Sequence, residues 1–323
     1  MVKTAAPPIW KAAIIDHATL MAMVFSEEDW LIDGLVICGG LTAFGGKKKL
    51  GKSLACLQMA CAVANGGYFL GRKCAQGKVV YVCLEDGYKR VQKRLNRQEA
   101  PDDIPVQYVS RFRPLDVGGM KDLGDLLTEC KPKLLIIDTI AAAKTGRTDE
   151  NDAGAMGDIG NHLRVLAQDF ECAILAVLHH GKIATNDPGF DIRGSSAISG
   201  AADVNLGLYR SEETYTLRGE GRDVDEIELR IALDVPTLTW NVVGDARRIA
   251  RDEVNDEVVD TVGALGEADA GTVAREIGKS RQRVQTVLKR LVKEGKLTSK
   301  AQKIGRTNKI IYSLSRERER ERE

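Results

Sequence analysis

The sequence predicts an α/β protein whose main part is a mostly parallel sheet flanked by helices, followed by a small C-terminal α+β unit. Between about residues 35 and 240, short apolar runs alternate with longer segments of helical period, which is typical of strands buried on both faces. After Asp245 the pattern changes to a charged helix and then to a small basic unit. The chain has 323 residues, of which 43% are apolar, enough for about two domains.

The expected strands and helices follow one another in the order of a parallel sheet. The expected strands are Val36–Phe44, Lys78–Leu84, Leu134–Asp138, Ala173–Leu178 and Val204–Tyr209. The expected helices are Lys52–Ala64, Tyr88–Gln98 and Ile159–Phe170. Three later segments alternate more cleanly between apolar and polar residues and predict an antiparallel extension of the sheet: Tyr215–Leu217, Glu226–Leu233 and Leu238–Val242.

Changes in composition suggest four parts. We expect an N-terminal extension at 1–29 that contains a short helix within Trp10–Val24, and the α/β domain at 30–250. The basic domain is expected at 253–315 and a disordered tail at 316–323. The tail alternates Arg and Glu strictly, so it has no apolar side chain to bury.

Cysteine usage and the first residues bear on the compartment. The seven cysteines are odd in number and form no C-x-x-C pair. Met1–Ala13 has no apolar core of a signal peptide, and no apolar run reaches the roughly 18 residues that a membrane helix needs. We therefore expect a cytoplasmic protein with no membrane partner.

A phosphate-binding loop is predicted between the first strand and the first helix. The run Gly46-Lys47-Lys48-Lys49-Leu50-Gly51-Lys52-Ser53 fits the pattern G-x-x-x-x-G-K-[ST]. Glycines let successive backbone N–H groups face an anion at a helix N-terminus. The pattern predicts that this loop, with Leu54 after it, binds ATP, that Lys52 reaches the β- and γ-phosphates, and that Ser53 ligates Mg²⁺.

Two carboxylates complete the predicted site. Asp138 ends an apolar strand and is the expected Walker-B-type ligand of Mg²⁺. The next residue is Thr139 and not Glu, so the group that activates water is expected elsewhere, after the strand that follows the phosphate loop. Glu85 stands there as the candidate. Its neighbour Asp86 remains an alternative for this role.

This order of motifs resembles the RecA-like core of DnaB-type and RepA-type hexameric helicases, from roughly Trp30 to Val242. The resemblance implies that Arg94, nine residues after Glu85, lies near the nucleotide. It also implies a γ-phosphate sensor at the end of the strand that closes with His179-His180; His179 is preferred and His180 stays open. The segment Asp191–Val204 resembles a loop near the ring's channel, which assigns Arg193 to single-stranded DNA.

The resemblance further implies an arginine that completes the site of the neighbouring subunit. The candidates are Arg218 and Arg222. The Lys-x-Arg of DnaB-type helicases matches Glu220-Gly221-Arg222, so Arg222 fits this arginine finger. The chain departs from the pattern at Glu220, and also at Lys48, where related sequences often have proline.

The basic C-terminal segment resembles a winged helix-turn-helix domain. Its second helix, after Ser280, has apolar residues at i, i+3, i+4 and i+7, and a hairpin is expected over Leu297–Leu314. Arg275–Leu314 contains 12 basic and 2 acidic residues, a net charge of +10, so the rest of the chain carries −9. These features predict contact with duplex DNA. The candidate residues are Arg281, Gln282, Arg283, Gln285, Lys289, Lys303, Arg306 and Lys309.

Together the resemblances imply an ATP-hydrolysing DNA helicase of the RepA type. It would form a homo-oligomeric ring, expected to be a hexamer, that uses ATP and Mg²⁺, translocates on single-stranded DNA and replicates a plasmid or another mobile element. Glu85, Lys52, Asp138, His179 and Arg222 would carry the chemistry. Two alternatives remain: a DNA-dependent RecA-like ATPase without unwinding activity, such as a recombinase-like filament or a loader, and an ATP-switched DNA-binding regulator.

Overall fold

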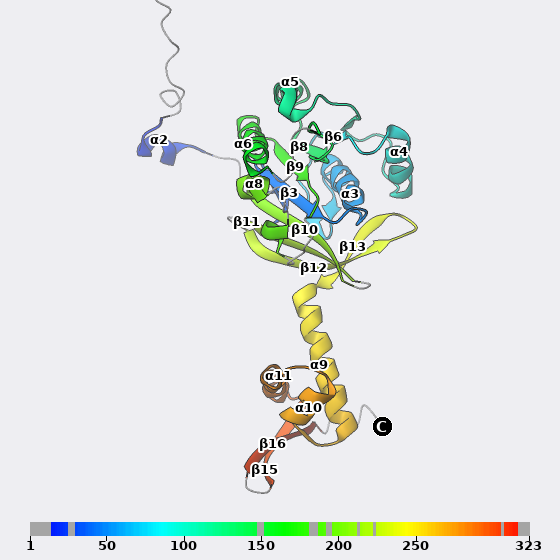
Figure 1. The fold of residues 1–323 in the computed structure, drawn as a ribbon, viewed down its shortest axis with the longest axis vertical. Helices are drawn as coiled ribbons and strands as arrows, with labels where there is room; N and C mark the ends of the chain where they lie inside the picture. The colour runs from blue at the N-terminus through cyan, green and yellow to red at the C-terminus, as the bar shows by residue number, and fades with distance from the viewer. Residues whose placement is uncertain are drawn as a thin grey trace, which may run out of the picture.

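The computed structural model describes residues 14–24, 30–146, 152–180, 187–191, 196–211, 214–221, 224–304 and 307–315. They form an α/β body, from β1 to β13, and a C-terminal unit, from α9 to β16 (Figure 1). No helix of this described part is long and apolar enough to cross a membrane.

The main sheet has nine strands in the described residues, in the order β13-β12-β11-β10-β3-β9-β8-β6-β7. Neighbours from β10 to β7 are parallel, and β10 to β13 pair antiparallel. The parallel strands are β3 (Leu41–Gly46), β6 (Val79–Cys83), β7 (Val106–Val109), β8 (Leu134–Asp138), β9 (Ala173–Val177) and β10 (Val204–Ser211). The antiparallel strands are β11 (Thr214–Gly221), β12 (Val224–Asp234) and β13 (Thr239–Asp245).

Helices cover both faces of the sheet. The helices are α3 (Lys52–Asn65), α4 (Tyr88–Arg97), α5 (Met120–Cys130), α6 (Ala153–Asp169), α7 (Pro188–Asp191) and α8 (Ser196–Ala201), with a π-helical turn η1 (Leu115–Gly119) before α5. Two small antiparallel pairs complete the body: β1 (Trp30–Ile32) with β2 (Val36–Ile37), and β4 (Tyr68–Phe69) with β5 (Arg72–Lys73).

Alternation along the buried strands produces two separate cores. In β8, Leu134 and Ile136 face the core that contains α3, whereas Leu135 and Ile137 face the core that contains α5 and α6. This is the two-residue period of a strand that is apolar on both faces. Because all the parallel strands point the same way, their carboxyl ends, with the polar residues that follow them, meet at one edge.

The mostly parallel α/β fold is confirmed, with differences at its margins. The expected strand Val36–Phe44 is two strands, because the chain turns at Gly39, where φ is 60°. The edge strand β7 and the helix α5 were not predicted. The three antiparallel strands are each longer than expected.

The C-terminal unit contains α9 (Ala246–Leu265), β14 (Ala268–Asp269), α10 (Ala270–Glu276), α11 (Arg281–Lys293), β15 (Leu297–Ile304) and β16 (Thr307–Leu314). Its strands pair in the order β14-β16-β15. The residues expected at the apolar positions of α11, Val284, Val287, Leu288 and Leu291, are buried in its core. Ser280 is the N-cap of α11, as predicted, and accepts a hydrogen bond from the Arg283 N–H.

The N-terminal helix α2 (His17–Ala22) begins at the N-cap Asp16, whose side chain accepts a hydrogen bond from the Thr19 N–H. None of its residues is buried. Residues 1–13, which include Trp10, and residues 25–29 of the predicted extension lie outside the described residues, as does the Arg-Glu tail.

Candidate nucleotide site

The phosphate loop joins β3 to α3. Gly51, the N-cap of α3, has a φ of 98°, a conformation that favours glycine. A Cβ atom at this position would also lie 2.8 Å from Cζ2 of Trp240. The loop therefore needs glycine at 51 for both its conformation and its packing. The side chains of Lys47, Lys48 and Lys49 are exposed beside it.

Lys52 is buried inside the loop, with 5% of its surface exposed. Its Nζ donates hydrogen bonds to the carbonyls of Gly46, at 2.8 Å, and Lys47, at 3.1 Å, and lies 3.3 Å from Nδ1 of His179. Burial lowers the pKa of Lys52, and the charge of Asp138 opposes that shift. The ammonium group is thus held close to where a bound phosphate would replace these partners.

Asp138 ends β8 as a buried carboxylate. Its Oδ2 accepts a hydrogen bond from the Tyr81 hydroxyl at 2.6 Å, and its Oδ1 is buried without a hydrogen-bond partner among the described residues. Burial raises the pKa of Asp138. A carboxylate oxygen without a partner and the nearby hydroxyl of Ser53 are hard oxygen ligands of the kind that Mg²⁺ takes. These residues fit the predicted ion.

Glu85 and His179 follow β6 and β9 and meet at the same edge of the sheet. Oε1 of Glu85 accepts a hydrogen bond from the Thr139 hydroxyl at 2.8 Å and lies 3.5 Å from Nε2 of His179. The Glu85 side chain is 45% exposed. It therefore has room to contact a water molecule while Thr139 holds one of its oxygens.

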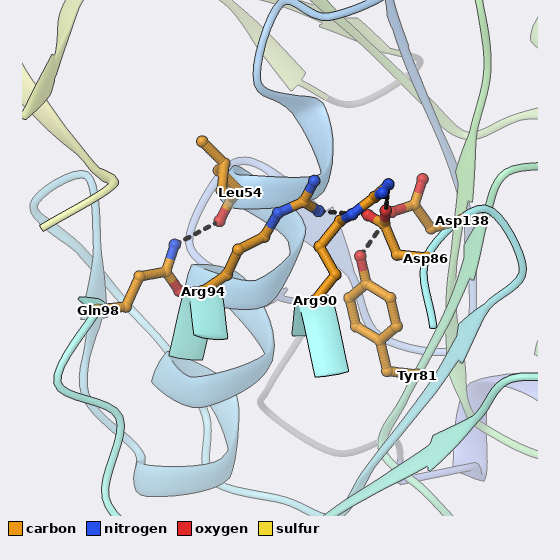
Figure 2. Close-up of polar contacts among 7 residues, drawn as sticks. All are labelled: Leu54, Tyr81, Asp86, Arg90, Arg94, Gln98 and Asp138. Carbon is orange, nitrogen blue, oxygen red and sulfur yellow. Dashed lines mark hydrogen bonds and ion pairs between the residues drawn. The ribbon is translucent and has the colours of Figure 1, made fainter. Parts of the chain in front are cut away.

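Asp86 is engaged differently from Glu85. Its carboxylate forms ion pairs with Arg90, at 2.6 Å, and with Arg94 (Figure 2). Arg90, Arg94 and Gln98 lie at i, i+4 and i+8, on one side of α4 and its C-cap. Gln98 donates hydrogen bonds from Nε2 to the carbonyls of Leu54, at 3.0 Å, and Leu238, at 2.9 Å.

These groups line a cavity of about 530 Å³, a volume typical of small-molecule sites. The sequence-predicted residues Lys48, Lys49, Leu50, Gly51, Lys52, Ser53, Leu54, Glu85, Arg94 and His179 all line it. Asp138 lies against it through its neighbour Thr139 and through its electrostatic contact with Lys52. The structure thus brings together predicted residues as far apart as Lys48 and His179, which are 131 positions apart in the chain.

His180 is separated from this cavity. Its ring packs against that of Tyr209 in a tilted arrangement, with the centroids 5.0 Å apart, and burial lowers its pKa to about 4. Of the two candidate fingers, Arg218 forms an ion pair with Glu228 at 2.7 Å and lies over the ring of Tyr209. Arg222 and Arg193 lie outside the described residues.

The predicted duplex-binding residues fall into two groups. Arg281, Gln282, Arg283 and Lys289 are exposed on α11, and Gln285 is half-buried there. In the hairpin, Lys309 is ion-paired with Asp269 and Lys300 with Glu267. The position of Lys303 in β15 is described but its side chain is not, and Arg306 lies outside the described residues.

Several residues of the site were not found by sequence reasoning. Tyr81 is an aromatic residue within an apolar strand, and only its contact with Asp138 distinguishes it. Trp240 and Gln98 reach the phosphate loop from distant segments, and no motif marks them. The Glu-Asp-x-x-x-Arg-x-x-x-Arg spacing that joins Asp86 to Arg90 and Arg94 was a usable signal, since it predicts pairs one turn apart on a helix.

Comparison with known protein families and curated proteins locates the relatives of this chain. The model of the family AAA_25, described as an AAA domain, matches residues 13–184. The DNA repair protein RadA of Chlamydia muridarum is 30% identical over 110 residues, 34% of this chain and 21% of that protein. RadA of Haemophilus influenzae is 23% identical over 184 residues, 56% of this chain and 35% of that protein. The chain therefore spans between a fifth and about a third of these relatives.

Two solved structures share this fold. The ATPase domain of G40P superposes with a TM-score of 0.52 at 13% identity, covering 73% of this chain and 99% of that one. A DnaB-like replicative helicase, solved to describe its interactions with primase, superposes with a TM-score of 0.50 at 13% identity, covering 64% of this chain and 57% of that one. At this identity the likeness concerns the fold.

Proposed function

Because the chain belongs to the AAA_25 family of AAA domains and has a RecA-like P-loop ATPase fold, we propose that it is an ATP-hydrolysing DNA helicase of the RepA type. The observation that carries this proposal is the meeting of Lys52, Glu85 and His179 in one cavity at the carboxyl edge of the sheet. Phosphate contacts, a carboxylate for water and a polar sensor are what phosphoryl transfer to water requires.

The chain's own residues divide the work of hydrolysis. The N–H groups of the loop and of the first turn of α3 bind phosphate oxygens, and Lys52 exchanges the carbonyls of Gly46 and Lys47 for the β- and γ-phosphates. Glu85, oriented by Thr139, accepts the proton of the attacking water. His179 lies between Lys52 and Glu85 and so is placed to sense the γ-phosphate. Asp138 and Ser53 would hold Mg²⁺, which neutralises phosphate charge when bound.

A neighbouring subunit would complete each site with Arg222. The contacts of Arg218 with Glu228 and Tyr209 within its own chain support Arg222 as the residue that reaches across. An arginine in this role stabilises the charge that develops on the transferred phosphoryl group.

Exposed apolar side chains around α2 support assembly into a ring. Leu20, Met21, Met23 and Val24 are exposed, Val24 to 96%, and no residue of α2 is buried. A cluster of apolar side chains with this exposure is typical of a surface that a partner covers. We assign it to a second copy of the chain, in a ring that we propose is a hexamer.

The two proposed DNA contacts lie in different parts of the chain. Single-stranded DNA would pass through the ring and meet the loop that carries Arg193. Duplex DNA would bind the C-terminal unit, whose order of helix, strand, two helices and hairpin supports a winged helix. Arg281, Arg283 and Lys289 on α11 are exposed and form no ion pair among the described contacts, so their charges are available to phosphates.

Strand displacement on a forked duplex tests the helicase. The wild type should unwind the fork in the presence of ATP and Mg²⁺, and single-stranded DNA should stimulate its ATPase activity. Lys52→Ala should lose both activities, because it loses its phosphate contact. A wild-type protein that neither unwinds the fork nor responds to single strands would contradict the proposal.

A second candidate is a DNA-dependent ATPase that does not unwind duplexes. The RadA relatives, which are named as DNA repair proteins, favour a role on DNA. This second candidate predicts stimulation by single-stranded DNA without strand displacement. An ATP-switched regulator instead predicts sequence-specific duplex binding that persists in Glu85→Gln. Strand displacement, stimulation of the ATPase by single strands and sequence-specific duplex binding, each measured on Lys52→Ala and Glu85→Gln, separate these functions.

A further inference from the structure

The hairpin formed by β12 and β13 lies against the phosphate loop. Trp240, in β13, is 1% exposed. Its indole Nε1 donates a hydrogen bond to the carbonyl of Gly51 at 3.1 Å, and its ring occupies the space that a side chain at 51 would need. A residue 189 positions away therefore fixes the N-cap of α3, where the phosphates would bind.

Side chains of α3 and α4 hold this hairpin by its backbone. Gln58 bonds the Trp240 main chain twice, accepting from its N–H at 2.8 Å and donating to its carbonyl at 3.0 Å. Gln98 donates to the carbonyl of Leu238, and Arg97 donates to the carbonyls of Val235 and Pro236. The position of the hairpin beside the cavity is thus determined by several directed contacts.

Leu238 lines the cavity from this hairpin, together with Leu54 and Arg94. It adopts a left-handed backbone conformation, with a φ of 57°, which is unfavourable for a leucine. Glu85 and His179 are the groups that would face the γ-phosphate, so the surface of Leu54, Leu238 and Arg94 is the part of the cavity left for the base and ribose.

Among the residues that line this surface, few groups could read the edge of a base. Gln98 has a buried Oε1 without a hydrogen-bond partner among the described residues, but Gln98 does not line the cavity. The carbonyls of Leu54 and Leu238 already accept hydrogen bonds from Gln98. The Arg94 guanidinium is ion-paired with Asp86 and presents a planar face, which stacks on rings without selecting one base.

We propose that the β12–β13 hairpin is a second wall of the nucleotide site: Trp240 positions the phosphate loop, and Leu238 with Leu54 and Arg94 packs against the base without reading its edge. The substrate class is then nucleoside triphosphates whose base packs against this wall, with ATP and GTP accepted alike. This inference rests on the proposed nucleotide hydrolysis.

Calorimetric titration of the full chain with ATP and with GTP, without DNA, tests the base preference. The two dissociation constants should agree within about tenfold, because apolar packing discriminates weakly and an edge-reading site discriminates by several orders of magnitude. A preference of a hundredfold or more for either nucleotide would overturn the inference.

Two variants test the wall itself. In Leu238→Asn the new residue tolerates the left-handed backbone. This variant should raise the dissociation constants for ATP and for GTP by the same factor, about five- to tenfold. Trp240→Phe removes the N–H donor and should raise the KM for ATP severalfold with kcat nearly unchanged, since the loop binds ground and transition states alike. Val243→Asn, at a position of β13 that is 57% exposed, is the matched control.

The outcomes separate this inference from the function on which it rests. If the wild type binds nucleotide and both Leu238→Asn and Trp240→Phe leave binding and KM unchanged, the second wall is wrong and the ATPase stands. If the wild type hydrolyses nucleotide but fails to unwind DNA, the proposal of a helicase is wrong. The second wall is then still decided by Leu238→Asn and Trp240→Phe. Absence of any nucleotide binding would contradict both.

Discussion

Glu85 and Asp86 are adjacent, yet their contacts assign them different tasks. Glu85 accepts a hydrogen bond from Thr139 and its side chain is 45% exposed, whereas the oxygens of Asp86 are held by Arg90 and Arg94. The sequence left both open for the role of activating water. The geometry supports Glu85 for that role and Asp86 as the residue that positions the two arginines.

The pair of variants Glu85→Gln and Asp86→Asn tests this division. Glu85→Gln should lower kcat by about 10²–10⁴-fold, the usual contribution of a general base, while nucleotide binding is kept. Asp86→Asn should mainly raise KM, because it releases Arg94 from its place at the cavity. Steady-state ATPase kinetics distinguish them, and equal losses of kcat in both variants would contradict the assignment.

His180 gives the stability of the body a dependence on pH. Burial lowers its pKa from 6.5 to about 4, and the charge of Asp191 opposes this shift. Between these pH values the unfolded chain binds a proton that the folded chain excludes, so the free energy of unfolding falls as pH decreases from 6.5 to 4.

The variant His180→Phe keeps an aromatic ring against Tyr209 and cannot bind that proton. Its loss of stability between pH 6.5 and 4 should be shallower than that of the wild type, by up to about 1 kcal/mol per pH unit. Urea unfolding at pH 7, 6 and 5 measures this difference. Parallel losses in the two proteins would show that His180 is not the titrating group.

Residues that belong to a motif were predictable one by one, and residues that act through tertiary contact were not. The phosphate loop, Asp138 and Glu85 occupy positions that the pattern of strands fixes. Trp240 contacts the loop at Gly51 and Gln98 contacts the first turn of α3 at Leu54, in both cases through a backbone carbonyl, and any segment could supply such an acceptor. Their role depends on the antiparallel extension folding back onto α3.

At the scale of elements, α11 and the hairpin β15–β16 differ in whether their basic side chains form ion pairs. Lys300 and Lys309 are paired with Glu267 and Asp269, so their charges already stabilise the C-terminal unit. The exposed cations of α11 have no such partners among the described contacts. We expect α11 to contribute more to duplex binding than these two lysines, although the sequence pointed equally to Lys309.

Neutralising the cations of α11 and, separately, a lysine of the hairpin measures how much each contributes to duplex binding. Arg281→Gln with Lys289→Gln should weaken binding of a short duplex. The slope of log Kd against the logarithm of the salt concentration should fall by about two, one for each lost phosphate contact. The control Lys300→Gln should leave the salt dependence nearly unchanged. An equal effect of both changes, or an unchanged affinity in the α11 variant, would contradict the assignment and favour a protein partner.

Elements with a strong apolar period were predicted closely, and weakly patterned ones were missed. β8 coincides with its prediction, and α3 differs by one residue at its end. β7 has four residues, none fully buried, at the edge of the sheet. Its apolar pattern is too short to separate it from a loop.

At the scale of the whole molecule, the apolar side chains around α2 make a prediction about assembly. Leu20→Asp with Met21→Asp places charges on the surface that we assign to a second copy. The ring should dissociate into smaller species in sedimentation velocity, and ATPase activity should fall if a neighbouring arginine completes each site. The exposed polar residues of the same helix supply the controls His17→Gln and Thr19→Gln. An unchanged oligomer would exclude α2 from the interface.

The net charge of +1 is a cancellation between parts. Arg275–Leu314 carries +10 and the remainder −9. Sequence alone located this division, because charge counting needs no coordinates. It could not say which cations remain unpaired, since that depends on the contacts of α11 and of the hairpin.

The helix α9 begins directly at the end of β13, and Val258, Val259 and Val262 in its second half are buried in the core of the C-terminal unit (Figure 1). Of its 20 residues, only the eight before Val254 precede that core, and at 1.5 Å per residue they span about 12 Å. On the proposed function, this short helical connection, which contains no loop, would hold a duplex bound by the C-terminal unit at a fixed distance from a strand bound by the α/β body.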